Sequence, residues 1–511
     1  VAKTFGSAVS GVDANLITIE VNVGQGTSFF MVGLPDSAVK ESQQRVESAL
    51  KYFNYRMPRQ KVVINLAPAD VRKEGSAYDL PIAMGILQAS EQVNFPELDR
   101  YIIMGELSLD GNLRPIKGVL PIAIEARKRG FKGFILPLEN AKEASIVNNI
   151  DIIGVETLDQ AVDFLQGTLD IEPLVTDTRE IFYHSLDESE FDFADVQGQE
   201  NIKRAMEIAA AGGHNVIMIG PPGAGKTMLA KRLPSILPPL SLQEALETTK
   251  IHSVAGKLGR NASLLAQRPF RSPHHTISDV ALVGGGGNPQ PGEISLAHNG
   301  VLFLDELPEF KRTVLEVMRQ PLEDGQVTIA RAAATLTYPA RCSLIAAMNP
   351  CPCGYHGDRL RPCTCTRSTV EAYLRRLSGP LLDRIDIHME VPRIPHTDLM
   401  KSVPGESSAE IRERVVAARN RQHARCSSFG WEPRANSLLM PKEMGSACPL
   451  TPACKELLGN AVQRLNLSAR AHDRILKVAR TIADLASEES ISESHIAEAV
   501  QYRSMDRRLF G

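Results

Sequence analysis

The sequence predicts an α/β protein that ends in a helical part. Two observations support this prediction. Strand-like apolar runs alternate with helix-like segments over roughly the first 166 residues, and further apolar runs lie at 216–219, 301–304 and 344–348. From about residue 397 the pattern is helical. A chain of 511 residues is expected to form about three domains.

A phosphate-binding loop follows the run at 216–219. It fits the pattern G-x-x-x-x-G-K-[ST] in full and consists of Gly220, Pro221, Pro222, Gly223, Ala224, Gly225, Lys226 and Thr227, with helix-forming residues from Met228 onward. Such glycines let backbone N–H groups point at phosphate oxygens, and the positive end of the next helix faces the same anion. We expect ATP to bind along this stretch as far as Met228, with Lys226 on the β- and γ-phosphates and Thr227 on Mg²⁺.

Polar residues end the other two apolar runs. Asp305 and Glu306 follow Val301–Leu304, at the edge where a parallel sheet binds ligands. We expect Asp305 to bind Mg²⁺ through water and Glu306 to orient and activate the attacking water. Alone, such an acidic pair is usually a solvated loop. Asn349 ends the third run and is expected to position the water or sense the γ-phosphate.

Arg384 lies in a short segment, 379–386, after the last of these strands. An arginine at such a place can reach the ATP of a neighbouring subunit and act as a finger in trans. This series of strands resembles the core of the AAA+ ATPases. The resemblance implies a P-loop NTPase fold for this part of the chain.

Composition excludes several classes of protein. The net charge of -3 is nearly neutral, so nothing global demands a polyanionic partner, and any contact with nucleic acid must be local. No apolar run approaches the roughly 18 residues of a membrane span, and no signal-peptide pattern opens the sequence. We therefore expect a soluble, cytoplasmic protein without a membrane partner.

The eight cysteines are unevenly placed, because none precedes Cys342 and five lie between Cys342 and Cys365. A disulfide-stapled secreted protein would be shorter and would spread its cysteines. Two C-x-C pairs, Cys351 with Cys353 and Cys363 with Cys365, can supply the four thiolates of a closed structural Zn²⁺ site. The usual spacing is C-x-x-C, so free thiols remain an alternative.

The first part of the chain predicts a complete α/β domain. The expected strands are 16–23, 28–32, 61–66, 101–104 and 133–136, and the expected helices are 37–53, 80–88, 119–129 and 140–147, followed by a short strand and helix. The phrases at 73–79 and 105–115 resemble the proteolytic domain of Lon proteases. In those enzymes a desolvated lysine takes the proton of a serine. Ala77 and Leu120 stand at the two catalytic positions, so the resemblance implies this fold without peptidase activity. Ser76 with Lys117 is a weak residual possibility.

The predicted domains are 1–168, similar to Lon protease, an acidic linker at 169–192, an AAA+ core at 193–395 and a helical lid at 396–511. In AAA+ proteins the segment that begins at about residue 193 borders the adenine pocket. In the lid, 409–425, 452–466 and a third stretch from Ser468 read as helices. Arg470 lies in the first turn of that third helix, where an AAA+ lid carries a second sensor for the γ-phosphate. Arg474 is the alternative sensor, and either arginine could be a surface charge.

Two further segments are candidates for contacts outside the ATP site. The run 268–275 contains Arg268, Arg271 and the pair His274-His275, which could touch a phosphate backbone, bind metal or act structurally or between subunits. The stretch 326–340 reads as a hairpin with its tip near Arg331, and such hairpins are typical of the AAA+ branch of magnesium chelatases and replicative helicases. Arg331 is the candidate for DNA, although an ordinary surface arginine is about as plausible.

Over nearly its whole length the chain resembles the ComM/YifB family, with the opening phrase at 33–41 included. The resemblance implies a homo-hexameric, ATP-driven DNA helicase, assembled with the help of ATP and DNA, that migrates branched junctions and handles single strands during natural transformation. The alternative is a protein-remodelling or chelatase-like ATPase with a substrate other than DNA. A DNA motor should be stimulated by nucleic acid, whereas a chelatase motor should need porphyrin-binding partners.

Overall fold

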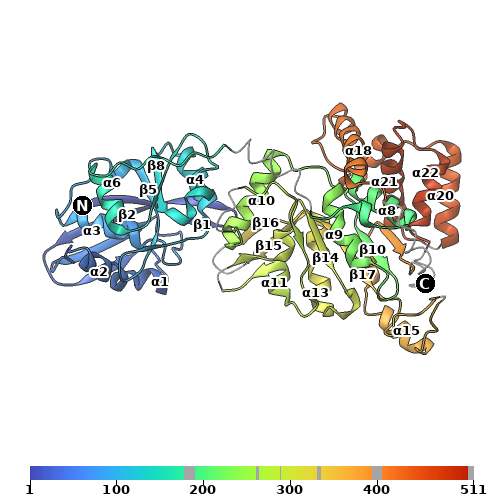
Figure 1. The fold of residues 1–511 in the computed structure, drawn as a ribbon, viewed down its shortest axis with the longest axis horizontal. Coiled ribbons are helices and arrows are strands. Elements are labelled where there is room, and N and C mark those ends of the chain that lie inside the picture. The colour runs from blue at the N-terminus through green and yellow to red at the C-terminus, as the bar shows by residue number, and fades with distance from the viewer. Residues whose placement is uncertain are drawn as a thin grey trace.

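The computed structural model describes residues 1–177, 190–259, 264–287, 289–330, 335–358, 360–393, 405–465 and 467–504. Figure 1 shows an N-terminal α/β unit at one end of an elongated molecule, a central α/β unit beside it, and a group of C-terminal helices at the other end. Among the described residues, no helix combines the length and the apolar character that crossing a membrane requires.

The N-terminal unit is built on a mixed sheet with the strand order β3-β4-β2-β1-β5-β8-β9. The strands are β1 (Ala2–Ser10), β2 (Asp13–Gly24), β3 (Phe29–Val32), β4 (Lys61–Ala67), β5 (Tyr101–Ile103), β8 (Gly133–Pro137) and β9 (Asp151–Val155), and β6 (Glu106–Leu107) pairs with β7 (Leu113–Arg114) outside this sheet. β1 runs antiparallel to β2 and parallel to β5, so a hairpin forms the middle of the sheet. The alternating strand and helix pattern predicted for this part of the chain is confirmed.

Two elements of this unit differ from the prediction. The sequence did not predict β1, although it is the strand that joins the antiparallel and parallel halves of the sheet. The single helix expected at 37–53 is two helices, with Glu41 as the turn residue between them. The helices are α1 (Ser37–Lys40), α2 (Ser42–Tyr52), α3 (Asp79–Ala89), α4 (Val119–Lys128), α5 (Leu138–Ala144) and α6 (Leu158–Gln166).

A helix of the central unit completes the N-terminal core. α10 (Leu242–Ala255) starts in a capping box, in which Ser241 and Glu244 bond each other's backbone N–H groups, and it packs on α4. The apolar cluster of the N-terminal unit includes Leu240, Ala245 and Leu264. The two units are therefore continuous through their packed interiors.

The central unit is built on a parallel sheet with the strand order β11-β14-β17-β10-β18. The strands are β10 (Val216–Ile219), β11 (Phe270–Arg271), β14 (Val301–Leu304), β17 (Ser343–Met348) and β18 (Ile387–Glu390). β10 lies between β17 and β18. The next strand along the chain, β11, is not adjacent to β10 but lies at the other end of the sheet, beyond β17 and β14. The crevice beyond the carboxyl end of β10 is therefore the expected ligand site of such a sheet.

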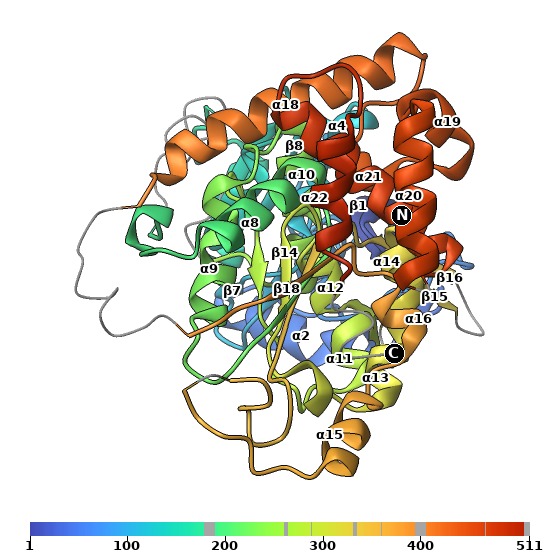
Figure 2. The ribbon, with the colours of Figure 1, turned by 90° about the vertical axis from the view of Figure 1, so that its right-hand side faces the viewer.

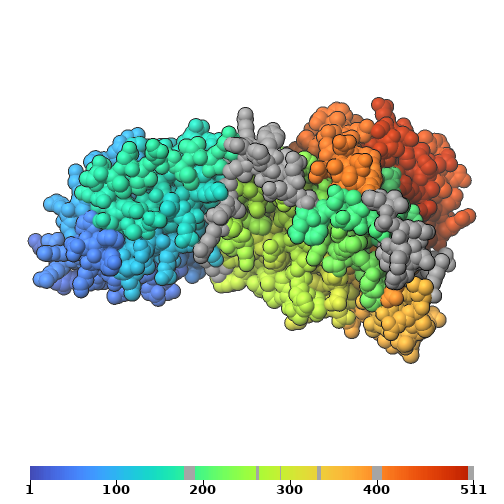
Figure 3. Space-filling view, viewed as in Figure 1, coloured from blue at the N-terminus to red at the C-terminus, as the bar shows by residue number. Residues whose placement is uncertain are grey.

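Helices and a hairpin surround this sheet. The helices are α8 (Glu200–Gly212), α9 (Lys226–Ile236), α10, α11 (Asp279–Val283), α12 (Glu293–Leu296), α13 (Arg312–Val317), α14 (Arg319–Asp324), α15 (Arg367–Leu374) and α16 (Gly379–Leu382), and β12 (Gly284–Gly285) pairs with β13 (Gln290–Pro291). The predicted hairpin is confirmed as β15 (Gln326–Ala330) paired with β16 (Thr335–Pro339). The segment around α15 projects as a knob at the lower right of Figure 3.

The C-terminal part is helical, as predicted. It contains α18 (Ser408–Ser428), α19 (Met444–Ala447), α20 (Pro452–Leu465), α21 (Ala469–Leu485) and α22 (Glu493–Gln501). Side chains cap the starts of two of these helices, because Thr451 accepts from the N–H of Cys454 and Ser468 from that of Ala471. α18 runs along the top of Figure 2, and both α18 and α21 pack on α8 of the central unit.

Candidate nucleotide site

The phosphate loop has a backbone that depends on its glycines. β10 ends at Ile219 and α9 begins at Lys226, so the loop joins the middle of the sheet to the start of a helix. Gly225 has a φ of 88°, in the left-handed region that favours glycine. Gly220 has no room for a side chain, since a Cβ there would lie 2.1 Å from the carbonyl oxygen of Val391.

The lysine of the loop is buried and bonds the loop itself. Its Nζ donates to the carbonyl oxygens of Gly220 (2.6 Å) and Pro221 (3.0 Å) and to Asn349 Oδ1 (3.1 Å). Burial lowers the pKa of Lys226, and the nearby carboxylate of Asp305 opposes that shift. The structure therefore brings together the lysine and the asparagine that the sequence singled out on neighbouring strands.

The hydroxyl of Thr227 donates to Asp305 Oδ2 at 2.9 Å, which joins the start of α9 to the end of β14. Mg²⁺ prefers oxygen ligands in proteins, and this hydroxyl and this carboxylate offer two oxygen atoms side by side. Glu306 directly follows and has a φ of 53°, an uncommon conformation for a residue other than glycine. Its N–H donates to Asp305 Oδ1 at 2.9 Å, which fixes the turn that carries both acids.

Glu306 contacts a histidine to which the sequence assigned no catalytic role. His275 Nδ1 lies 3.3 Å from Glu306 Oε2, and the ring of His274 lies against that of His275 with 4.0 Å between centroids. β11 brings this pair to β14, because the two strands are adjacent in the sheet. The histidine pair was visible in the sequence, but the strand order that places it beside Glu306 was not.

The segment before α8 contacts the other side of the loop. Gln199 has a φ of 56°, and its Nε2 donates to the carbonyl oxygens of Ala224 and Pro392, both at 3.3 Å. Phe193 and Val196 are fully buried beside it. Met228, in the first turn of α9, is partly buried against the same apolar cluster. These contacts fit the border of a base pocket that the resemblance implies here.

Arg384 lies at the amino ends of the parallel strands, opposite the phosphate loop at their carboxyl ends. These two sides of the sheet are called its amino edge and its carboxyl edge. The carbonyl oxygen of Arg384 accepts from Asn215 Nδ2 at 3.2 Å, and Asn215 precedes β10. The four residues of β10 span about 13 Å at roughly 3.3 Å per residue, so this edge is remote from the chain's own phosphate loop. The Arg384 guanidinium is largely buried, donates to Pro380 O at 2.7 Å and pairs with Glu323.

The two candidate sensor arginines belong to this same edge. Arg474 pairs with Asp386, which is buried just before β18. The hydrogen bond from Arg384 lowers the pKa of Glu323, and the charges of Arg470 and Arg474 act in the same direction. The structure therefore groups the lid arginines with Arg384 and separates all three from the phosphate loop of their own chain.

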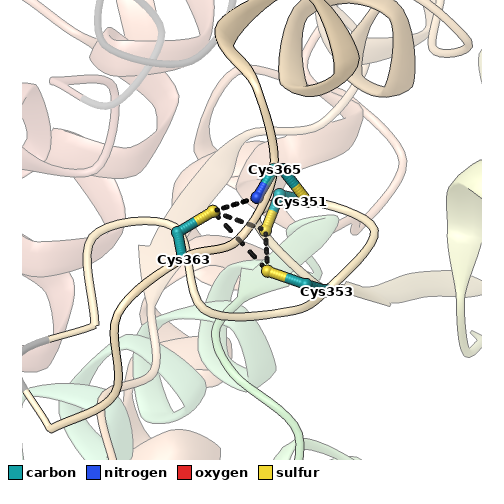
Figure 4. Close-up of side chains that lie close together, drawn as sticks. All are labelled: Cys351, Cys353, Cys363 and Cys365. Atoms are coloured by element: carbon teal, nitrogen blue, oxygen red, sulfur yellow. Dashed lines mark hydrogen bonds between the residues drawn. The ribbon is translucent and has the colours of Figure 1, made fainter.

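The four cysteines converge in the loop between β17 and α15 (Figure 4). Three sulfur pairs are 3.3, 3.5 and 3.7 Å apart, and all four Sγ atoms lie within 4.8 Å of one another. Four thiolates around Zn²⁺ at about 2.3 Å would be about 3.8 Å apart, so the cluster fits one tetrahedral ion with little movement. The backbone N–H of Thr364 is the main reason why the pKa of Cys353 is lowered, to about 5.

Three other predicted features have different outcomes. Arg331 lies outside the described residues, although the hairpin on either side of it is described. Leu120 is fully buried, and its N–H points at Glu143 Oε1 (3.2 Å). Ser76 donates to Glu106, whereas Lys117 lies against Gly256 of the central unit, so the structure does not pair Ser76 with Lys117.

Three family models match successive parts of the chain. The model described as "Magnesium chelatase, subunit ChlI" matches residues 192–399. The model "Subunit ChlI of Mg-chelatase" matches residues 19–140, and "Magnesium chelatase, subunit ChlI C-terminal" matches residues 405–503. Together they match most of the N-terminal unit, the central unit and the C-terminal helices.

Curated relatives match over the full length. YifB of Escherichia coli K12 is 47% identical over 511 residues, which cover 98% of this chain and 97% of that protein. Competence protein ComM of Haemophilus influenzae is 46% identical over 513 residues, which cover 99% and 98%. Lon protease 2 of Bacillus subtilis is 33% identical over 154 residues, which cover 27% and 26%.

Proposed function

We propose that this chain, which belongs to the ComM/YifB family of magnesium chelatase-like AAA+ ATPases, is a hexameric DNA motor. The motor migrates the branch points of recombination intermediates in natural transformation. The proposal has two steps, a nucleotide site shared between subunits and a DNA substrate. Each step draws on different observations.

The division of the site between two edges of the sheet supports a shared nucleotide site. Lys226, Thr227 and Asp305 lie at the carboxyl edge, and Arg384 lies at the amino edge. One chain cannot bring its own Arg384 to its own phosphate loop. In a head-to-tail ring each interface joins the carboxyl edge of one subunit to the amino edge of the next. Arg384 then acts in trans, with Arg470 or Arg474 beside it as the second sensor.

The residues at the carboxyl edge fit ATP and Mg²⁺. Thr227 and Asp305 would hold the ion, which neutralises phosphate charge, and Lys226 would leave the loop carbonyls for the phosphates. Glu306 orients the attacking water, held by its contact with His275. Asn349, whose Oδ1 accepts from Lys226, would position the water or sense the γ-phosphate. The four clustered cysteines fit a structural Zn²⁺.

The DNA substrate rests on the family and on the hairpin. A relative that is 46% identical over nearly the whole chain carries the name of a competence protein. β15 and β16 lie on the side of the central unit that faces the N-terminal unit (Figure 1), and a Cβ on Gly11 would lie 3.6 Å from Thr337 O. We assign the hairpin of β15 and β16 to the channel of the ring, and Arg331, which lies outside the described residues, is the candidate for a contact with DNA phosphates. The N-terminal unit then serves as an adaptor without peptidase activity.

The decisive experiment is migration of a labelled four-way DNA junction by the purified protein. Lys226→Ala removes the loop lysine, and Lys231→Ala, an exposed lysine on the same helix, is the matched control. We expect ATP-dependent strand exchange with the wild type and with Lys231→Ala, and none with Lys226→Ala. ATP hydrolysis without migration, and without stimulation by DNA, would refute the DNA motor and favour a protein-remodelling or chelatase-like ATPase.

A further inference from the structure

The cysteine loop rests directly on the phosphate loop. Gly354, next to Cys353, has a φ of 88°, and a Cβ built on it would lie 2.6 Å from Cδ of Pro222. The third residue of the phosphate loop therefore packs against the backbone of the cysteine loop. Asn349, the partner of Lys226, is only two residues before Cys351. The two loops are thus in direct contact, and Asn349, just after β17, adjoins both of them.

A second connection runs through Tyr355. Two guanidinium groups lie over its ring, that of Arg361 at 4.2 Å and that of Arg393 at 5.1 Å from the centroid. Arg393 also reaches the carbonyl oxygen of Pro222 at 3.5 Å and the carboxylate of Asp358 at 3.8 Å. Arg393 therefore connects the cysteine loop to the phosphate loop from the end of β18.

The cysteine loop is held by side-chain contacts and single turns, without regular secondary structure in its described residues. Its described residues between Cys351 and Cys365 form neither helix nor strand. Backbone bonds such as Gly354 N–H to Cys351 O (3.0 Å) and Cys365 N–H to Cys363 Sγ (3.4 Å) give single turns. Ordering such a loop costs conformational entropy, and binding one metal ion to four thiolates can supply the free energy that offsets it.

We propose that Zn²⁺ bound by these four cysteines fixes the surface on which Pro222 rests, and that zinc occupancy thereby sets the affinity of the neighbouring site for ATP. This inference rests on the nucleotide site proposed above but not on the DNA substrate. The metal has no place in the chemistry of hydrolysis. Its effect passes through the contact of Gly354 with Pro222 and through Arg393.

Metal content and nucleotide binding test this inference with the full-length protein and without DNA. Zinc is measured by plasma mass spectrometry, and the dissociation constant is measured with a fluorescent ATP analogue. We expect about one zinc per chain in the wild type and in Cys426→Ser, a buried cysteine outside the cluster. Cys353→Ser with Cys363→Ser should lose the zinc and weaken nucleotide binding about tenfold or more, the equivalent of one lost contact of about 1.4 kcal/mol.

A glycine pair separates the contact from the metal. Gly354→Ala should keep the zinc and still weaken nucleotide binding about tenfold, because its methyl group displaces Pro222. Gly357→Ala is the matched control, since Gly357 lies in the same loop with a φ of 79° but has no neighbour within 4 Å. Wild-type protein without zinc, zinc loss without weaker binding, or equal effects of the two glycine variants would each overturn the proposal.

Discussion

Replacing Asp386 with asparagine should loosen the C-terminal helices from the central sheet. Asp386 is 2% exposed and accepts a hydrogen bond from the backbone N–H of Asn215 at 3.0 Å. It also pairs with Arg474 of α21 and lies 3.3 Å from Nδ1 of His214. One carboxylate thus joins the amino ends of the central strands to α21, a helix of the C-terminal part.

The cost follows from these partners. An amide of the same shape can still accept from Asn215 if its oxygen takes the place of Oδ2, but its NH₂ group then faces Arg474 as a second donor. A hydrogen bond to a charged group contributes about 1.5–3 kcal/mol, and breaking a buried ion pair costs about 3–5 kcal/mol. Because the Arg474 side chain is 24% exposed and partly hydrated, we take the lower end, about 3 kcal/mol. That is roughly a 100-fold increase in the opening of α21.

Amide hydrogen exchange measures this opening. Exchange of the α21 amides should rise roughly 100-fold in Asp386→Asn, with strands of the N-terminal sheet as internal reference. Asp473→Asn is the control, since its half-exposed carboxylate contacts the neighbouring His472. Unchanged protection of α21 would show that Asp386 does not hold this helix to the central sheet, and the reasoning would fail.

The same residue predicts a pH dependence. Burial alone would raise the pKa of Asp386, but Arg474 and His214 outweigh it and hold the pKa well below the ordinary value of 3.8. A carboxylate with a depressed folded-state pKa contributes stability that is present above its unfolded-state pKa and is lost as the pH falls through the folded-state pKa. The difference between wild type and variant should therefore be constant above about pH 5 and shrink below about pH 4.

Three further variants test the nucleotide site. Glu306→Gln should reduce ATP hydrolysis by about 10²–10⁴-fold and retain bound ATP, as a filter-binding assay would show, and normal turnover would rule out its role as base. Arg384→Ala should stop hydrolysis while sparing nucleotide binding, with the exposed Arg375→Ala as control; hydrolysis at the wild-type rate would refute the trans finger. His275→Ala should lower kcat about tenfold at unchanged KM, because Glu306 loses its orienting contact. His275→Gln should restore part of the lost kcat. A change in KM alone would contradict this positioning role.

The sequence predicted those parts of the site that are contiguous along the chain. The loop from Gly220 to Thr227 is one uninterrupted motif, and apolar runs just before Asp305 and Asn349 marked the strands that carry them. His275 could not be placed, because β11 has two residues and therefore no periodicity to read. The position of Arg470 depends on how α21 docks against Asp386, a long-range contact that no local pattern encodes.

The same distinction holds for the fold. β1 contains Gly6, Ser7 and Ala8, and such small residues give little alternation of apolar and polar side chains. The break at Glu41 leaves a continuous helical periodicity on both sides, so the sequence predicted one helix where there are two. Cysteine spacing identified the four thiols that converge, but their support of Pro222 depends on Gly354, whose left-handed backbone the spacing does not reveal.

The N-terminal unit and α10 share an apolar interior, so a break in the chain between the two units should not separate them. Besides the buried side chains, the N–H of Gly118 donates to Ser253 O at 3.0 Å, and the hydroxyl of Ser253 bonds Glu143. A nick by a protease in the acidic segment at 169–192 would cut the covalent link and leave this interface intact. The two fragments should then sediment as one particle, and fragments expressed apart should find each other again, so the acidic segment connects halves that are already held together.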